Sequence, residues 1–313
     1  MIEKNIIVGE GTEYPLNGIL TLPDAASPEA PVPAVVFVHG SGASNMDEKV
    51  MKLTPFKDLA EGLASHGIAS IRYDKRSFAH GRKMLKEGDV TVVSETIEDA
   101  VLAAGILREE PSVDSGKIFI IGHSMGAMLA PRIDAEGGDF AGLVIMAGTP
   151  RTLDEVMMGQ NEDVLRKVKG LTRWIVKKQV AKLEKTFAPL HEMSDEEAKK
   201  VKVGGGTTLY YFKEMAEHPA ADYLLAGTKP VLILQGDKDF QVSVEKDFNA
   251  YKTLLKERPN VTYRLYEGLN HAFVPAISDN IMKVKQEYGT ERHIGEEVIG
   301  DLTSWIHEQT EEK

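Results

Sequence analysis

One serine in this chain stands in a pattern that would make it a nucleophile. Residues 122–126 read G-H-S-M-G, the G-x-S-x-G form in which a tight turn between a strand and a helix exposes the serine. Residues 117–121 before it predict a strand, and residues 125–133 after it predict an apolar helix. The alternative is a helix start that needs glycine only for packing. With both flanking elements present, the pattern predicts Ser124 as a catalytic nucleophile.

A serine hydroxyl attacks a substrate only when a base takes its proton and an acid orients that base. On a sheet of this kind the chain order is Ser, then Asp or Glu, then His. Five histidines follow Ser124, and His271 alone comes directly after a predicted strand, at residues 261–265. We therefore predict His271 as the base.

The acid is predicted after another strand, residues 231–235, which is followed by Asp237 and Asp239. These two carboxylates are two positions apart, so both cannot face His271. The turn spacing favours Asp239, while Asp237 is expected to stabilise the turn through its backbone. Glu267 is a less favoured third choice. Both strand ends lie at the carboxyl edge of the sheet, where open α/β sheets bind ligands.

Two backbone N–H groups are predicted to stabilise the negative charge on the substrate oxygen. One belongs to Met125, which follows the nucleophile at the start of a helix. The other belongs to Ser41, in a loop of small residues after the first buried strand. Gly40 in this loop is a candidate for substrate contact. His39 is expected to bond loop backbone rather than to act as a base.

Tyr210 and Tyr211 are further candidates for substrate contact. They precede Phe212 in a helix predicted at residues 209–217, and three consecutive aromatic residues cannot all face the core. Ordinary helix packing is the alternative for each of them.

The elements that must hold these residues alternate between strands and helices. Strands are predicted at residues 34–38, 69–73, 117–121, 143–147, 231–235 and 261–265, and helices at 56–65, 95–108, 125–133, 244–256 and 296–308. The strand at 34–38 is apolar on both faces, as in a parallel sheet covered by helices. Residues 4–8 and 17–22 form a predicted hairpin before it. The sequence thus predicts an α/β fold with a mostly parallel twisted sheet and helices on both faces.

This alternation stops in the middle of the chain, where no strand is predicted. Apolar residues between 176 and 187 recur with helical spacing, and Ser194 begins a capping box. We therefore predict a helical cap inserted at residues 150–228. The α/β core is then formed by residues 1–149 and 229–313.

The composition limits the kinds of ligand. The 313 residues include 37 basic and 48 acidic side chains, and the net charge of −11 argues against nucleic acid and an anionic membrane surface. The sequence has no cysteine, no nucleotide-binding glycine loop and no H-E-x-x-H motif, so we expect no metal and no cofactor. No signal peptide pattern stands at the start and no apolar run reaches the ~20 residues of a membrane span. A cytoplasmic location is expected, unless a leader has been removed.

Longer strings of the sequence resemble the α/β-hydrolase superfamily, and within it the bacterial carboxylesterases of the EstD type. These strings are residues 54–69 (TPFKDLAEGLASHGIA), 72–76 (RYDKR), 234–242 (LQGDKDFQV) and 268–271 (GLNH). The resemblance extends from the N-terminal hairpin to the last helix. It implies an esterase whose triad is Ser124, Asp239 and His271, with a helical cap between the sixth and seventh strands of the fold.

The predicted reaction is hydrolysis of a short-chain acyl or aryl ester through an acyl-enzyme. A thioesterase or a cinnamoyl or feruloyl esterase with the same triad is the nearest alternative. A non-hydrolytic protein of this fold and a non-catalytic binding protein are the others. The expected partner is a small-molecule ester, and the inserted helices are a candidate homodimer contact.

Overall fold

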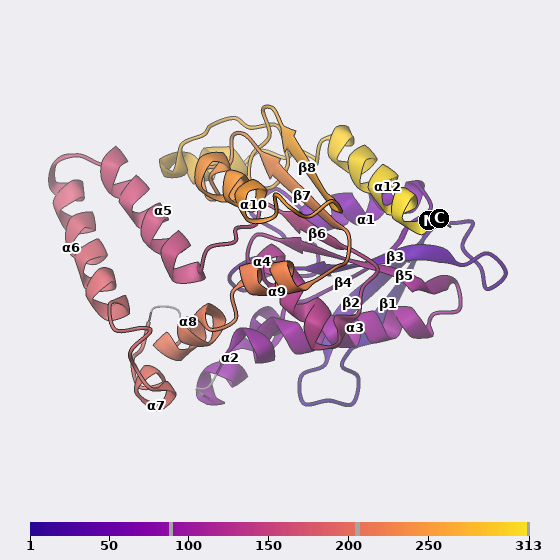
Figure 1. Cartoon of the computed structure of the whole chain (residues 1–313), viewed down its shortest axis with the longest axis horizontal. Helices are drawn as coiled ribbons and strands as arrows, with labels where there is room; N and C mark the ends of the chain where they lie inside the picture. The colour runs from indigo at the N-terminus through magenta and orange to yellow at the C-terminus, as the bar shows by residue number, and fades with distance from the viewer. Residues whose placement is uncertain (88–89, 204–206, 312–313) are drawn as a thin grey trace.

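The strands form one eight-stranded sheet in the computed structural model, which describes residues 1–87, 90–203 and 207–311. The strand order is β1-β2-β4-β3-β5-β6-β7-β8. β1 pairs antiparallel with β2 and β2 antiparallel with β4, and all remaining neighbours are parallel (Figure 1). The strands are β1 (Ile2–Val8), β2 (Leu16–Leu22), β3 (Val32–Val38), β4 (Ala69–Tyr73), β5 (Val113–His123), β6 (Leu143–Met146), β7 (Val231–Gly236) and β8 (Val261–Tyr266).

Helices cover both faces of this sheet. The core helices are α1 (Pro55–Ser65), α2 (Arg76–Glu87), α3 (Glu98–Glu109), α4 (Met125–Ile133), α10 (Asn249–Leu254), α11 (Val284–Tyr288) and α12 (Glu296–Thr310). Short helical turns are η1 (Val93–Ile97), η2 (Asp134–Gly138), η4 (Val244–Phe248) and η5 (Ile281–Lys283).

Strand β3 shows how the two faces divide. Val35 and Phe37 pack with residues of α1 and α12, while Val36 and Val38 pack with residues of α3 and α4. All four side chains are fully buried. A strand that is apolar on both faces therefore lies between two helical layers, and the predicted α/β fold class is confirmed.

The elements differ from the sequence predictions in several places. The predicted helices at 95–108 and 244–256 each begin with a π-helical turn, η1 and η4, before the regular helix. Helix α2 was not predicted, and among its described side chains Met84 is the single buried apolar one. This helix also has non-helical backbone angles at His80.

Among the described residues between β6 and β7, the regular elements are all helices. They are α5 (Leu153–Lys167), α6 (Gly170–Phe187), α7 (Asp195–Ala198), α8 (Leu209–Ala216) and α9 (Ala220–Ala226). We call residues 150–228 the inserted segment; Gly204, Gly205 and Gly206 within it lie outside the described residues. Ser194 accepts a hydrogen bond from the Glu197 backbone N–H, as the capping-box pattern predicts.

The inserted segment has two parts. Helices α5 and α6 stand away from the sheet, whereas α9 lies against α4 (Figure 1). Leu224 of α9 is buried in the same cluster as the sheet residues. The end of the segment therefore packs with the core. No helix within the described ranges is long and apolar enough to cross a membrane.

Candidate active site

Ser124 occupies the sharp turn between β5 and α4. Its backbone has φ +54° and ψ −116°, a strained conformation for a residue with a side chain. A Cβ at Gly122 would lie 2.2 Å from the Gly126 carbonyl oxygen, and a Cβ at Gly126 would lie 2.1 Å from the Val38 carbonyl oxygen. Both contacts are impossible, so the two glycines of the motif let the chain make this turn and expose the serine at the sheet edge.

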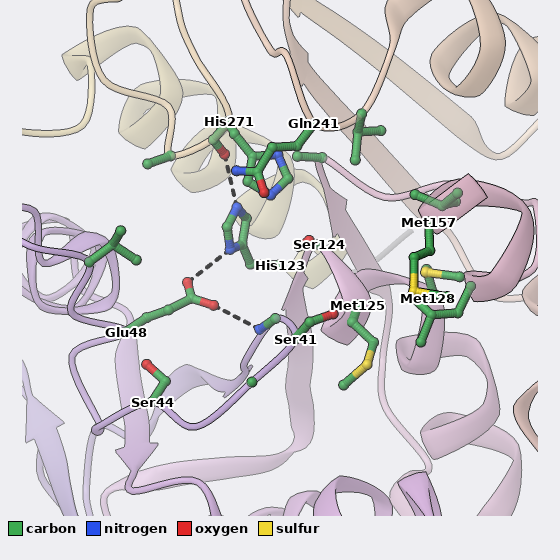
Figure 2. Close-up of a pocket in the computed structure, with 18 of the residues that line it drawn as sticks. Ser41, Ser44, Glu48, His123, Ser124, Met125, Met128, Met157, Gln241 and His271 are labelled. Atoms are coloured by element: carbon green, nitrogen blue, oxygen red, sulfur yellow. Dashed lines mark hydrogen bonds and ion pairs between the residues drawn. The ribbon is translucent and has the colours of Figure 1, made fainter. Parts of the chain in front are cut away.

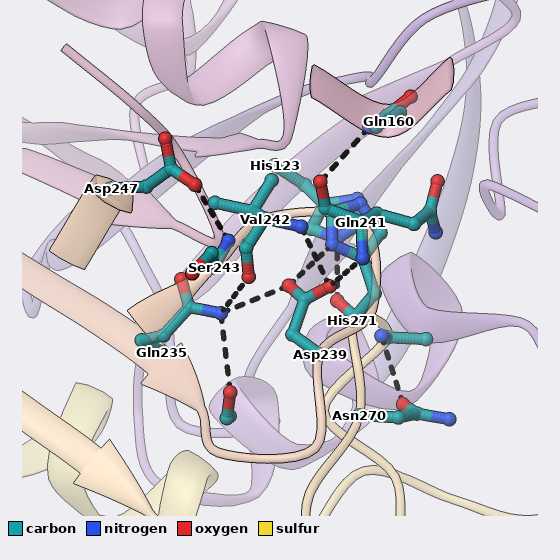
Figure 3. Close-up of polar contacts among 12 residues, drawn as sticks. His123, Gln160, Gln235, Asp239, Gln241, Val242, Ser243, Asp247, Asn270 and His271 are labelled. Atoms are coloured by element: carbon teal, nitrogen blue, oxygen red, sulfur yellow. Dashed lines mark hydrogen bonds and ion pairs between the residues drawn. The ribbon is translucent and has the colours of Figure 1, made fainter. Parts of the chain in front are cut away.

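The loop after β8 carries His271 to the same edge. Its Nδ1 lies 2.7 Å from Oδ2 of Asp239, which follows β7. The Asp239 side chain is fully buried, and its Oδ1 accepts the backbone N–H groups of Gln241 at 2.7 Å and Val242 at 2.9 Å (Figure 3). Gln235 donates to Oδ2 at 2.9 Å. The carboxylate is therefore held in one orientation, with an oxygen aimed at the imidazole.

Asp237 has a different position, although it is only two residues away. Its Oδ1 accepts the backbone N–H of Gly268 at 2.7 Å, and its Oδ2 lies 3.0 Å from the Lys238 ammonium. This carboxylate joins the loop after β7 to the loop after β8. It contributes to the placement of the His271 loop without contacting the ring.

Asn270 holds the loop on the other side of the histidine. Asn270 is fully buried, its Oδ1 accepts the Ala272 N–H at 2.9 Å, and its amide donates to Glu287 at 2.6 Å. Because these hydrogen bonds hold the loop on either side of His271, they fix the position of its imidazole ring.

Ser124 and His271 both line a pocket of about 550 Å³. No hydrogen bond joins the side chains of Ser124 and His271 in the part of the chain that the structure describes. Much of the remaining lining is apolar and comes from α4, α5 and α8: Met125, Met128, Leu153, Val156, Met157 and Phe212 (Figure 2). The pocket therefore offers an apolar space beside a serine and a histidine.

The residues predicted for the oxyanion hole lie at this pocket. Gly40 and Ser41 line it, and a Cβ at Gly40 would lie 3.2 Å from the Ser124 Cβ. Among the described residues, neither the Ser41 N–H nor the Met125 N–H has a protein acceptor. Both groups are thus free to bind a substrate oxygen.

The two candidate tyrosines are separated by the structure. Tyr211 lines the pocket, and its hydroxyl donates to Glu95 at 2.7 Å. Tyr210 does not line the pocket: it packs against the small cluster within the inserted segment, with the Lys199 ammonium 4.9 Å from its ring centre. Adjacent residues on a helix point about 100° apart, so one face of α8 meets the pocket and the other does not.

His123 and Glu48 form a buried ion pair that the sequence analysis missed. His123 Nδ1 lies 2.9 Å from Glu48 Oε2, and its Nε2 donates to the His271 carbonyl oxygen at 2.9 Å (Figure 2). Burial lowers the pKa of His123, but the Glu48 carboxylate outweighs burial and the pKa lies above its ordinary value. Burial raises the pKa of Glu48, but His123 holds it below the ordinary value. Each of the two groups therefore stabilises the charged form of the other.

The available signal for His123 was its place inside the G-x-S-x-G motif. Glu48 had no local signal, because it lies in a loop 75 positions earlier in the chain. His39, by contrast, bonds the Asn45 carbonyl oxygen at 3.0 Å, which is a structural contact within its own loop. Within the described ranges, no group of three His, Cys, Asp or Glu residues could hold a metal ion.

Known proteins resemble this chain over most of its length. Residues 29–275 match the family described as Hydrolase_4, Serine aminopeptidase, S33. The chain is 34% identical to Esterase EstD of Thermotoga maritima over 304 residues, covering 97% of this chain and 67% of that protein. The resemblance to EstD-type carboxylesterases stated from the sequence is confirmed.

Solved structures resemble it in fold. Est1E from Butyrivibrio proteoclasticus superposes with a TM-score of 0.60 at 16% identity, over 97% of this chain and 98% of that one. A proline iminopeptidase from Mycobacterium smegmatis superposes with a TM-score of 0.59 at 14% identity, over 98% of each chain. The predicted α/β-hydrolase fold, with helices inserted between the sixth and seventh strands, is the fold observed.

Proposed function

Because the chain belongs to the family described as Serine aminopeptidase, S33, and is a carboxylic ester hydrolase, we propose that it cleaves short-chain acyl or aryl esters with Ser124, His271 and Asp239. One observation carries the proposal. The buried carboxylate of Asp239 lies 2.7 Å from His271 Nδ1, and the imidazole shares a pocket with the strained Ser124. The arrangement supplies a nucleophile, a base and an acid that orients the base.

The proposed reaction transfers the acyl group first to Ser124 and then to water. His271 Nε2 takes the Ser124 proton while the hydroxyl attacks the ester carbonyl, and it then gives this proton to the departing alcohol. Asp239 keeps the ring proton on Nδ1 and stabilises the imidazolium. The Ser41 and Met125 N–H groups bind the oxyanion, and each is worth ~3 kcal/mol in the transition state. Water repeats the sequence on the acyl-enzyme.

The pocket supports a small apolar acyl group. Its volume is about 550 Å³, and methionine and aliphatic side chains from α4 and α5 line it. We propose that the inserted segment acts as a cap, because α5 and α8 contribute Leu153, Met157 and Tyr211 to that lining.

An aryl acyl group is the second candidate. One of the structurally similar proteins, Est1E, has been solved with ferulic acid bound, at 17% identity to this chain. A cinnamoyl or feruloyl ester is therefore included among the substrates to test. The corresponding thioesters separate an esterase from a thioesterase.

The test is hydrolysis of p-nitrophenyl esters with two to twelve acyl carbons by the wild type and by Ser124→Ala. We expect turnover that is highest for the shorter chains and is lost in Ser124→Ala, with an unchanged melting temperature. Ser65→Ala, at an exposed serine at the end of α1, is the matched control and should behave as wild type. Wild-type turnover in Ser124→Ala would refute the proposed nucleophile. A folded wild type that hydrolyses only thioesters, or nothing at all, would refute the proposed substrate class.

A further inference from the structure

Lys75 is a buried cation that none of the proposed steps uses. It follows β4 at the carboxyl edge of the sheet, and its side chain is only 2% exposed. Its ammonium donates to the Gly40 carbonyl oxygen at 2.9 Å and lies 3.6 Å from Glu95 Oε1. Burial lowers the pKa of Lys75, and the carboxylates of Glu95 and Glu48 act in the opposite direction. A lysine so thoroughly removed from water is costly unless its partners compensate it.

The Gly40 carbonyl belongs to the same peptide group as the Ser41 N–H. A trans peptide is planar, and its C=O and N–H point in opposite directions. Since Lys75 holds the carbonyl, the Ser41 N–H must point away from the lysine. Ser124 adjoins this peptide, as the 3.2 Å approach of a Gly40 Cβ to the Ser124 Cβ shows.

The neighbouring peptide group is also fixed. The Gly40 N–H donates to Glu48 Oε1 at 2.8 Å, and Glu48 is held by its ion pair with His123 (Figure 2). Gly40 has no side chain to restrict its own backbone rotation. The orientation of the loop at Gly40 therefore depends on two buried charged groups, Glu48 on the N–H side and Lys75 on the carbonyl side.

Lys75 is linked in turn to the inserted segment. Glu95, in η1, uses Oε1 for Lys75 and accepts the Tyr211 hydroxyl on Oε2 at 2.7 Å. Burial, reinforced by Glu95, raises the pKa of Tyr211 well above its ordinary value, so this phenol stays a donor. The same hydroxyl lies 3.5 Å from the Met125 sulfur. A continuous buried chain thus joins α8 to the loop that carries the Ser41 N–H.

We propose that Lys75 is a positioning residue for the oxyanion hole, and that Tyr211 and Glu95 make its alignment depend on how α8 sits over the pocket. This inference rests on the proposed function, because it assigns the Ser41 N–H to the substrate oxygen. The ammonium also polarises the Gly40–Ser41 peptide, since hydrogen bonds in a chain strengthen one another at low dielectric. The N–H bond is strongest when the substrate oxygen carries charge, so the contribution appears in kcat rather than in KM.

The first test replaces the cation. For p-nitrophenyl butyrate, Lys75→Met should lower kcat by about 10²-fold, the effect of losing one oxyanion donor, with KM within about twofold. Affinity for a trifluoromethyl ketone of the same acyl length, which forms a tetrahedral adduct with the serine, should fall by the same factor. A merely structural role would not make these two losses parallel. Unchanged kcat and inhibitor affinity in a folded Lys75→Met variant, or a change in KM alone, would overturn the inference.

The second test removes the hydrogen bond between Tyr211 and Glu95 without leaving a buried charge unpaired. Tyr211→Phe deletes one hydroxyl and should lower kcat by about tenfold with KM unchanged. Tyr223→Phe is the matched control: this tyrosine of α9 also donates to a glutamate, Glu136, at 3.3 Å, but it lies outside the pocket. Equal kcat values for the two variants would refute the coupling through α8.

One further variant separates failure to fold from failure of the inference. If Lys75→Met does not fold because Glu95 is left unpaired, the double variant Lys75→Met/Glu95→Gln removes both charges and should show the same loss of kcat. If the double variant also fails to fold, the kcat of Tyr211→Phe, compared with that of Tyr223→Phe, tests the inference. Lost turnover in Ser124→Ala together with wild-type values in the lysine variants rejects this inference alone. Turnover that survives in Ser124→Ala rejects the proposed function as well.

Discussion

Asp239→Asn tests the proposed acid by a change of almost no volume. Oδ1 of Asp239 accepts two backbone N–H groups, at 2.7 and 2.9 Å, so the amide of the variant will keep its oxygen there. Its NH₂ group then faces His271 Nδ1 and the Gln235 side-chain amide, which is itself a donor. The imidazole can satisfy this donor only by carrying its proton on Nε2. In that tautomer it cannot take a proton from Ser124.

The expected loss is about 10⁴-fold in kcat, or roughly 5.5 kcal/mol of transition-state stabilisation, as for other triads whose acid becomes an amide. The assay is steady-state hydrolysis of p-nitrophenyl butyrate at pH 8, with thermal unfolding to show that the variant is folded. More than a tenth of wild-type kcat in a folded Asp239→Asn variant would refute the tautomer argument.

Asp237→Asn is the matched control, two residues away in the same loop. The amide oxygen can still accept the Gly268 N–H, and the substitution removes only an ion pair with Lys238, which is 46% exposed. Exposed pairs of this kind contribute about 0–1 kcal/mol, so activity should stay within about twofold of wild type. A large loss in Asp237→Asn with little loss in Asp239→Asn would reassign the acid.

Two other predictions concern the elbow and a buried histidine. Gly126→Ala would place a Cβ 2.1 Å from the Val38 carbonyl oxygen, so we expect a lower melting temperature and loss of esterase activity. At Gly105 no atom lies within 4 Å of an added Cβ, so Gly105→Ala should leave the melting temperature and the activity unchanged. Equal behaviour of the two variants would contradict the steric argument. Burial lowers the pKa of His39 from 6.5 to about 4, so between these pH values the unfolded chain binds a proton that the folded chain does not. Stability should therefore fall by about 3 kcal/mol as the pH drops from 6.5 to 4. Denaturant unfolding should show a flatter pH dependence in His39→Gln, which can still donate to Asn45; an equally steep profile in the variant would exclude His39 as the source.

The positions of the proposed triad residues could be predicted from short sequence patterns. The two glycines beside Ser124 allow a turn in which no larger residue fits at their positions. This requirement can be read from the five-residue motif at 122–126. Asp239 and His271 each follow a strand of a parallel sheet, and the carboxyl ends of such strands meet at one edge. The period of the apolar residues thus predicts that these side chains approach one another before any distance is known.

The inserted segment shows the limit of the same reasoning. Helices α6, α7 and α8 were expected from periodicity and a capping box, but which face of α8 meets the pocket depends on how the helix docks. Tyr210 and Tyr211 are adjacent residues of the same type, so the local sequence does not distinguish them. Of these two, only Tyr211 lines the pocket. Helix orientation is set by packing against distant elements, and a sequence pattern does not record it.

The sequence by itself determined the fold class, the turn that carries the proposed nucleophile and the strand ends that carry the proposed base and acid. Short-range sterics and apolar periodicity decide these features. The tertiary structure alone decided which buried charges support them. Glu48 pairs with His123, Lys75 with the Gly40 carbonyl, and Tyr211 with Glu95 across 116 positions of the chain. A buried charge requires a partner, but the partner's place along the chain follows from three-dimensional packing and leaves no local signal.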